Sequence, residues 1–432
     1  MELKKYKLAD IAKIEISGVD KKTMDGEIPV RLCNFVDVYY NWAITKEKAK
    51  SFMVASAKQT EIDKCSIGKD MVAITKDSET RDDIGIATYI ADDFEDVLLG
   101  YHCALITPNP AIVDGKYLNA FMHTRYIQKY FENNASGSGQ RYTLSNDTIS
   151  NIPVLLPSIE EQHTIGKLLA DLDRKIELNK QINDNLEAMA KQLYDYWFVQ
   201  FDFPNEEGKP YKSSGGAMVW NEKLKRKIPN GWTVETVGTY ANCKSGYAIK
   251  SSNFKAKGIP VIKIGNIQED YTLNMNGCQY IENNTNKLFY VYQNDVVIAM
   301  TGATIGKFAI VPFSETGYFV NQRVGKFEFG NNPIKKMPYL INSLKIDYFR
   351  NQIFQLASGC AQPNISVEQI NNISLLYPST KILSEYNMKC KWMYEQIANC
   401  RYQIDVLTKL RDKLLPLLMN GQALVNYHLS DD

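Results

Sequence analysis

Two loops far apart in the chain carry side chains that could contact nucleic acid. Gln140 and Arg141 lie in the first loop, and Gln362 and Asn364 lie in the second. Arginine, glutamine and asparagine form specific hydrogen bonds with base edges, whereas lysine and arginine also contact phosphates. Small residues precede both loops, and glycine lets a backbone approach a ligand closely. Each loop taken alone could still be an ordinary glycine-rich turn.

Further polar residues follow short apolar runs in both halves of the chain. In the second half they lie in residues 301–307 and 321–323, and the corresponding places in the first half are residues 76–80 and 100–102. We interpret these segments as loops that contact DNA. The predicted contact residues are Lys76, Gln140, Arg141, Lys263, Thr301, Thr304, Lys307, Gln322, Arg323, Gln362 and Asn364.

No pattern in the sequence predicts catalysis. No G-x-G-x-x-G follows a strand, and no Asn-Pro-Pro-Tyr-like tetrapeptide for amino-group methylation occurs. Residues 302–308 resemble a P-loop, but the spacing is one residue short and Phe308 replaces the Ser or Thr that holds magnesium. Four scattered histidines offer no Ser/His/Asp arrangement; His102 and His123 are expected to be satisfied interior or surface groups. We therefore predict no catalytic residue, no metal site and no cofactor in this chain.

Cysteine usage and hydropathy point to an ordinary cytoplasmic protein. The eight cysteines never form C-x-x-C, so reduced, buried thiols are expected. No run of about 18 apolar residues predicts a membrane span, and the N-terminus lacks the apolar stretch of a signal peptide. Charge is balanced overall, but residues 204–378 carry 19 Lys and Arg against 12 Asp and Glu. Such an excess favours a nucleic-acid surface only weakly.

The chain is duplicated. The sequence ASGSGQ at 135–140 recurs as ASGCAQ at 357–362, and the similarity continues to the Pro-Ser pairs at 157–158 and 378–379. Upstream, residues 70–75 resemble 295–300, and residues 31–34 resemble 263–266. Because the shared strings occur in the same order, chance similarity is an inadequate explanation.

Each half reads as an α/β body followed by a long helix. Apolar residues recur every three or four positions over 165–196 and 386–418, which is typical of a coiled coil. Polar Lys175, Asn179 and Arg411 fall on the apolar seam, where such residues can fix the register. Helices of 40 residues are about 60 Å long. We expect the two helices to pair antiparallel, although each could instead pack on its own body.

The predicted fold class is α+β, with two duplicated α/β domains separated by two long antiparallel helices related by a pseudo-two-fold axis. The predicted boundaries are residues 1–157 for the first domain, 158–203 for the first helix, 204–378 for the second domain and 379–432 for the second helix. Ser158 with Glu161 predicts a capping box at the start of the first helix, and the second helix lacks this box.

The end of the first helix resembles the specificity (S) subunit of type I restriction-modification systems. The similar segments occur in the family's order: LEAMA at 186–190, WFVQFDFP at 197–204, PYKSSGG at 210–216 and IPNGW at 228–232. The sequence LRDKLLPLLMNG at 410–421, at the end of the second helix, is another hallmark of the family. The resemblance covers essentially the whole chain, with residues 33–67 matching least.

This resemblance implies a non-catalytic subunit whose two target-recognition domains each read one part of a split DNA sequence. The paired helices would act as a ruler and as the docking site for two modification (methyltransferase) subunits. Those partners would bring S-adenosylmethionine, and motor-nuclease (restriction) subunits could join for cleavage. Trp197, Phe198 and Trp392 are candidate partner contacts, although they could equally pack within the helices or against a domain.

Two other functions remain open from sequence alone. The chain could be a coiled-coil adaptor with no role on DNA, or a stand-alone DNA methyltransferase or nuclease. The bases that are read, the spacing of the half-sites and the existence of a cognate nuclease do not follow from the residues.

Overall fold

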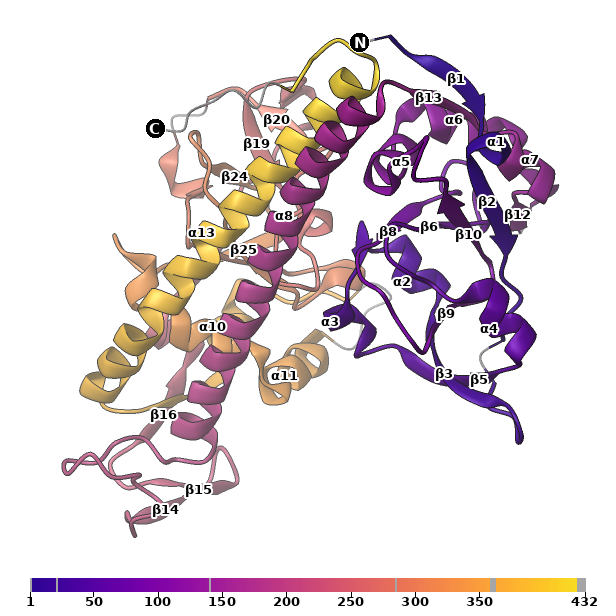
Figure 1. Ribbon diagram of the computed structural model, residues 1–432. Coiled ribbons are helices and arrows are strands. Elements are labelled where there is room, and N and C mark those ends of the chain that lie inside the picture. Colours follow the sequence, from indigo (N-terminus) through magenta and orange to yellow (C-terminus); the bar gives the residue numbers. More distant parts are fainter. Residues whose placement is uncertain (1, 21, 140, 284–285, 358–362, 426–432) are drawn as a thin grey trace, which may run out of the picture. The chain divides into compact units, whose positions relative to one another are not determined.

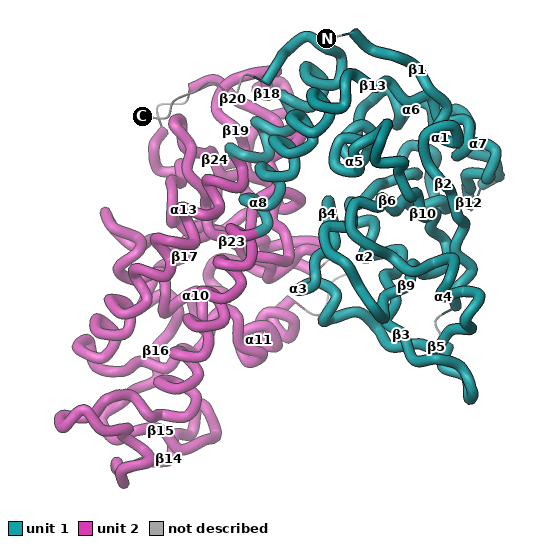
Figure 2. Tube along the Cα trace, in the orientation of Figure 1, with its two compact units in different colours: residues 1–177, 406–432 teal, residues 178–405 magenta. Residues whose placement is uncertain are grey.

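The computed structural model describes residues 2–20, 22–139, 141–283, 286–357 and 363–425. The chain forms two compact units (Figure 2): residues 1–177 with 406–432 make unit 1, and residues 178–405 make unit 2. Within the described ranges, no helix combines the length and the apolar character that a membrane crossing requires.

Unit 1 is built on a five-stranded sheet in the order β2-β10-β6-β8-β4, with β4 parallel to β8 and all other neighbours antiparallel. The central strands β6 and β8 are buried at every residue, because helices and a second sheet cover both faces. These five strands are β2 (Ala12–Ile16), β4 (Ala43–Ile44), β6 (Val72–Thr75), β8 (Ala87–Ile90) and β10 (Cys103–Pro108).

Smaller sheets and short helices complete unit 1 (Figure 1). Three strands pair in the order β5-β3-β9, β1 pairs with β13, and β11-β12-β7 form a small sheet. These strands are β1 (Lys4–Lys7), β3 (Ile28–Cys33), β5 (Met53–Ala57), β7 (Asp77–Ser78), β9 (Val97–Leu99), β11 (Ser136–Ser138), β12 (Arg141–Thr143) and β13 (Pro153–Leu156). The short helices are α1 (Leu8–Ile11), α2 (Phe35–Tyr39), α3 (Lys46–Ala49), α4 (Gln59–Cys65), α5 (Gly115–Met122), α6 (Arg125–Asn134) and α7 (Asn146–Ser150).

Unit 2 repeats this plan with shorter strands. A four-stranded antiparallel sheet has the order β17-β25-β22-β23, and a five-stranded sheet has the order β18-β20-β19-β24-β21. These strands are β17 (Cys243–Ser245), β18 (Phe254–Lys255), β19 (Ile259–Ile262), β20 (Tyr280–Ile281), β21 (Tyr290–Val291), β22 (Val296–Ala299), β23 (Phe308–Ile310), β24 (Tyr318–Val320) and β25 (Val324–Phe327).

The remaining strands of unit 2 form two pairs, β14 (Met218–Asn221) with β15 (Arg226–Pro229) and β16 (Thr233–Thr236) with β26 (Ser374–Tyr377). The α-helices are α9 (Val237–Tyr240), α10 (Met337–Lys345), α11 (Asp347–Ala357) and α12 (Val367–Asn371). The 3-10 turns are η2 (Ser251–Asn253), η3 (Ile264–Asn266), η4 (Lys287–Phe289), η5 (Gly302–Thr304) and η6 (Pro333–Lys335).

Equivalent backbone hydrogen bonds show that the two units share one frame. Lys76 N donates to His102 O (2.9 Å) in unit 1, and Met300 N donates to Arg323 O (3.0 Å) in unit 2. The strand pairs also match, because β3 runs parallel to β9 and β19 runs parallel to β24. The structure therefore supports the duplication and makes His102 equivalent to Arg323.

The register of the repeat differs from the sequence alignment in two places. The alignment matched Asp70 with Asp295, but Asp70 is equivalent to Asn294; these two have φ of 68° and 71°, and they donate to Ile90 O and Val311 O respectively. A run of apolar residues aligns almost as well when it is shifted by one position. The ladder allows no such shift, because a one-residue slip turns every side chain to the other face.

The second register difference lies at the end of β3. The sequence paired Asn34 with Asn266, but the strand ends at Cys33 and Ile262 accept equivalent backbone hydrogen bonds. Asn34 is therefore equivalent to Lys263. Each of these residues begins a short helical turn that is closed by a side chain three positions later.

Two long helices pass through both units: α8 (Ile159–Tyr194), which continues as the π-helical turn η1 (Asp195–Val199), and α13 (Thr380–Met419). The predicted capping box begins α8, since Ser158 N donates to Glu161 Oε2 (3.1 Å) and Glu161 N donates to Ser158 Oγ (3.3 Å). At the start of α13, Ser379 Oγ accepts from the backbone of Ile382, whose side chain offers no return bond.

The helices pair antiparallel within each unit. In unit 2, Asn179 donates to Gln403 Oε1 (3.2 Å), whereas further along α8 the carbonyl of Ala190 accepts from the hydroxyl of Tyr386 (3.4 Å). In unit 1, the first half of α8 packs with the last turns of α13 in one apolar core. The predicted fold class is thereby confirmed, and the polar seam residue Asn179 bonds across the pair as expected.

Candidate nucleic-acid interface

The ends of several strands meet at one edge in each unit. In unit 1, β3, β9 and β6 end at this edge, and β10 begins there. In unit 2, β19, β24 and β22 end at the equivalent edge, and β25 begins there. Loops that leave such an edge are held by the sheets on one side only, so their side chains can vary without disturbing the ladder.

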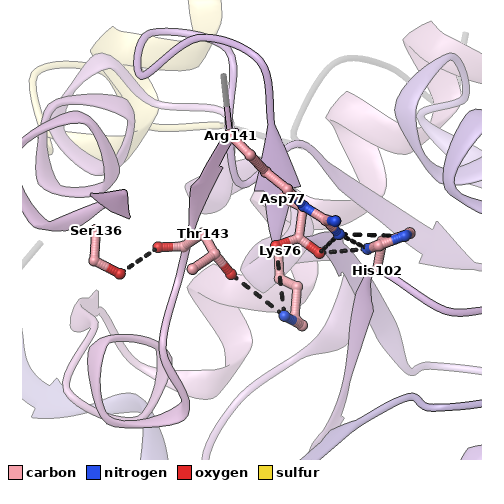
Figure 3. A network of polar contacts seen from close by, with 6 residues as sticks. All are labelled: Lys76, Asp77, His102, Ser136, Arg141 and Thr143. Carbon is pink, nitrogen blue, oxygen red and sulfur yellow. Dashed lines mark hydrogen bonds and ion pairs between the residues drawn. The ribbon is translucent and has the colours of Figure 1, made fainter. Parts of the chain in front are cut away.

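The polar corner of unit 1 is a connected network at this edge, made by Lys76, Asp77, His102, Arg141 and Thr143 (Figure 3). The carboxylate of Asp77 is its centre. Asp77 Oδ2 lies 2.5 Å from His102 Nδ1 and accepts from Arg141 Nη2 at 3.1 Å. The same Arg141 nitrogen also lies against the ring of His102.

Lysine and threonine close the other side of this network. Lys76 Nζ lies 3.5 Å from Asp77 Oδ1 and donates to Thr143 Oγ1 at 3.3 Å. On the neighbouring strand β11, Ser136 Oγ donates to Thr143 O at 3.2 Å. Strands β7 and β12 pair directly, with Asp77 opposite Thr143, so the backbone itself brings the carboxylate and Arg141 together.

Asp77 is kept ionised by its neighbours although only 7% of it is exposed. Burial alone would raise the pKa of its carboxyl group. Hydrogen bonds from Thr143 and His102, together with the charge of Lys76, outweigh burial and hold the pKa below the usual value of 3.8. The corner therefore contains a fixed negative charge surrounded by cationic and polar donors.

Of the residues predicted in unit 1, Lys76 and Arg141 lie together in this corner, and Gln140 lies outside the described residues. Asp77 and His102 lie in the predicted segments 76–80 and 100–102 but were not singled out as contact residues. The signal for His102 was present in the duplication, because His102 aligns with the predicted contact residue Arg323. His123 was expected to be a satisfied group, but its buried Nε2 has no hydrogen-bond partner among the described residues. Its ring stacks on Trp42, and burial lowers its pKa to about 4.

The polar corner of unit 2 consists of Thr301, Gln322, Arg323 and Asn364. Thr301 and Asn364 form an isolated antiparallel bridge, which is the counterpart of the pairing between β7 and β12 in unit 1. The side chains of Gln322, Arg323 and Asn364 are exposed. Thr301 Oγ1 is buried and has no hydrogen-bond partner among the described residues, so this corner is less completely bonded than its counterpart.

Two of the remaining predicted residues of unit 2, both lysines, are engaged by neighbours. Lys307 Nζ lies 3.0 Å from Glu269 Oε1, and Lys263 donates to Gln279 while its ammonium lies 4.3 Å from the centre of the Phe254 ring. Thr304 Oγ1 is buried without a partner in the described part of the chain. Gln362 lies outside the described residues.

Two of the three predicted partner contacts are inside unit 2. Trp197 and Phe198 are 2% and 1% exposed, because η1 turns both rings into the core against Tyr386, with ring centroids 5.7 and 4.8 Å away. Their burial favours the alternative of packing against the domain and removes them from direct contact with a partner. Trp392 on α13 is 49% exposed.

Neither corner resembles a metal centre. In the part of the chain that the structure describes, no three His, Cys, Asp or Glu residues gather as metal ligands. The donors at both corners are the guanidinium, amide, hydroxyl and ammonium groups that bind base edges and phosphates.

Comparison with known proteins gives the class to which this architecture belongs. The family model described as the type I restriction modification DNA specificity domain matches residues 1–188 and again residues 229–386. Because the match covers more than half of the sequence, the chain belongs to the type I restriction-modification specificity family, whose members are non-catalytic subunits.

Individual relatives agree with this assignment. The type I restriction enzyme MjaIX specificity subunit of Methanocaldococcus jannaschii is 26% identical over 326 residues, covering 74% of this chain and 71% of the relative. The HindI specificity subunit of Haemophilus influenzae is 23% identical over 398 residues, covering 80% and 85%. A crystal structure of the type I restriction-modification S subunit from M. genitalium shares the fold, with a TM-score of 0.61, 16% identity and coverage of 97% and 96%.

Proposed function

We propose that this chain reads a two-part DNA target, with unit 1 recognising one half-site through its polar corner and unit 2 recognising the other. The observation that carries the proposal is the repeated strand-end frame with different side chains at equivalent positions. Two units that share a backbone arrangement but carry different polar side chains at the strand ends are suited to recognising two different DNA sequences. Arg141 and Lys76 would act in the first, and Arg323, Gln322, Thr301 and Asn364 in the second.

The division of these roles follows the domain boundaries expected from sequence. Residues 1–157 and 204–378 would be the two target-recognition domains, and residues 158–203 and 379–432 would be the helical segments. Lys263, Thr304 and Lys307 would help through phosphate contacts, for which a change of side-chain conformation is enough. Gln140 and Gln362 stay predicted DNA contacts.

We further propose that two modification (methyltransferase) subunits dock on this chain and supply both catalysis and S-adenosylmethionine. Restriction subunits would join the same assembly for cleavage. Exposed Trp392 on α13 is the candidate partner contact, since a half-exposed tryptophan is typical of interface centres. The assembly would act in the cytoplasm, where the DNA is.

The decisive experiment is to express the chain with its methyltransferase subunits in a host without other DNA modification and to sequence the methylated bases. A bipartite motif that disappears when this chain is omitted is expected. Binding of the complex to that motif should weaken steeply with salt, because phosphate contacts release counterions. Unchanged methylation without the chain would instead favour the coiled-coil adaptor without a DNA role.

A further inference from the structure

The buried carboxylate of Asp77 is an unusual feature for an edge that would face DNA. Phosphates repel a carboxylate, and a buried charge is costly unless its neighbours pair with it. Asp77 is paired on both sides, by His102 and Arg141 through Oδ2 and by Lys76 through Oδ1. Its position indicates a role in orienting these neighbours.

The group that Asp77 orients is the guanidinium of Arg141. Its side chain is 56% exposed, and its contacts with described residues all run through Nη2. Nη1 and Nε therefore remain for an acceptor that approaches from outside. Both bidentate edges of a guanidinium contain Nη2, so a fork that matches O6 and N7 of guanine in the major groove would combine Nη1 or Nε with the Nη2 hydrogen that is not given to Asp77.

The backbone around Arg141 also limits its freedom. Gly137 on β11 has a φ of 129°, and a Cβ there would lie 2.2 Å from the carbonyl oxygen of Arg141. Only glycine allows β11 to approach so closely, and the pairing of Ser138 with Arg141 depends on this approach. On the other side, the ring of Tyr101 meets His102 edge to face at 3.8 Å between centroids.

We propose that Asp77 is a positioning residue. Together with His102, it orients the guanidinium of Arg141 to form hydrogen bonds with a guanine in the half-site that unit 1 recognises. This inference rests on the proposed function and specifies its chemistry. Reading a base requires a fixed direction, whereas a phosphate contact requires mainly charge. Pairing with a carboxylate fixes the direction of Arg141 while offsetting part of its charge, so the arrangement favours a base over a phosphate.

Unit 2 supplies the internal comparison. Its residue at the position of Asp77 is Thr301, and its residue at the position of His102 is Arg323. A hydroxyl cannot form the ion pair that Asp77 forms with Arg141. The dependence on a carboxylate is therefore confined to the first half-site.

The test uses the complete complex with its methyltransferase subunits and a DNA library in which every base of the motif is varied. Asp77→Asn keeps the shape of the side chain and removes its charge, whereas Arg141→Lys keeps the charge at that position and removes the fork. Asp96→Asn is the matched control. Asp96 lies in the same unit and accepts from Arg31 at 2.6 and 2.8 Å, and neither residue belongs to the polar corner.

The wild-type motif is expected to contain a guanine in the half-site of unit 1. Asp77→Asn and Arg141→Lys should each lower the preference for that guanine by about tenfold at this one position. The second half-site should keep its sequence in both variants, which also reports that the complex has folded. Asp96→Asn should leave the whole motif unchanged.

Several results would overturn the proposal. A uniform fall in methylation with an unchanged motif would make Arg141 a phosphate contact, and an equal loss at both half-sites would make Asp77 only a structural residue. An unchanged motif in both variants, or a wild-type motif without the guanine, would also reject it. Failure of the wild-type complex to methylate any bipartite motif would instead reject the proposed function.

Discussion

The polar corners of the two units occupy the same place in the same frame but are bonded in different ways. Asp77 joins the corner of unit 1 in a network of ion pairs, whereas in unit 2 the hydroxyl of Thr301 has no hydrogen-bond partner among the described residues. In both units the frame itself is held by backbone hydrogen bonds between strands. Side chains at these strand ends can therefore differ between the units while the backbone hydrogen bonds that position the strand ends stay the same.

The backbone hydrogen bonds at the strand ends are the same in both units, although the side chains differ. A backbone bond such as Leu144 N to Lys76 O, at 2.8 Å, has the counterpart Ile365 N to Met300 O, at 3.0 Å, although the accepting residues are a lysine and a methionine. Since the main chain supplies the bond, the side chain at that position is free to serve recognition. We therefore expect changes to the frame to affect stability most and changes to the corners to affect specificity most.

The largest effect should come from an ion cluster in unit 2 that links both long helices with α10. Glu187 on α8 lies 2.8 Å from Lys345 Nζ and 2.9 Å from Arg401 Nη2, and all three side chains are largely buried. Glu187→Ala leaves two cations facing each other without a counter-charge. The free energy of unfolding, measured by denaturant titration, should fall by about 3–5 kcal/mol.

Glu395→Ala is the control for this prediction, because Glu395 also lies on a long helix and pairs with Lys391 at the surface. An exposed pair contributes little, so this variant should unfold like the wild type. Equal midpoints for Glu187→Ala and the wild type would show that the stability of unit 2 does not depend on this cluster.

The next effect should appear in the corner of unit 2. Arg323→Ala removes an exposed guanidinium that would bind a base edge, so discrimination at one position of the second half-site should weaken by about 1–3 kcal/mol. Gln322→Ala should act on the same half-site. Sequencing of methylated bases provides the measurement, and an equal change in the first half-site would contradict separate reading by the two corners.

A smaller, matched effect should appear in two equivalent helix caps. Ser145 Oγ accepts from Thr148 N (3.0 Å) at the start of α7, and Ser366 Oγ accepts from Gln369 N (3.1 Å) at the start of α12. Alanine at either position should cost about 1 kcal/mol of unfolding free energy. Costs that differ severalfold would weaken the equivalence of the two frames.

The smallest effect is a dependence on pH that the polar corner of unit 1 should show and the polar corner of unit 2 should not. Because the folded pKa of Asp77 is lowered, its stabilising contribution is fully present above the unfolded pKa of about 4 and is lost as the pH falls through the folded pKa. The difference in unfolding free energy between wild type and Asp77→Asn should be constant above about pH 5 and shrink below about pH 4. Thr301→Ser should show no such change, and a difference that grows on acidification would contradict the assignment.

Much of the architecture could be predicted from the sequence. The duplication and the two long helices could be recognised because both halves keep a glycine-containing segment, a Pro-Ser pair and apolar residues every three or four positions. The register of the strands could not be predicted, because the apolar runs at 70–75 and 295–300 align nearly as well when one is shifted by one position. Hydrogen bonding in the sheet decides this point, and a single sequence carries no record of it.

The site was predicted in part for a similar reason. Arg141 and Arg323 are visible as cations in polar loops, but the importance of Asp77 depends on the pairing of β7 with β12, which lie 64 residues apart. Trp197 and Phe198 belong to an apolar helix face whose covering partner the sequence does not name. The π-helical turn η1 directs them inward, and its altered hydrogen bonding has no simple sequence signal.

The membership of α13 in both units has a consequence for synthesis on the ribosome. Unit 1 begins at the first residues of the chain, yet its apolar core includes Leu418 and Met419 near the other end. All the parts of unit 2 have been synthesised once residue 405 has been added. The portion translated first is thus completed last, and a premature stop shortly after residue 405 would harm the N-terminal unit more than the unit that lies nearer to the stop.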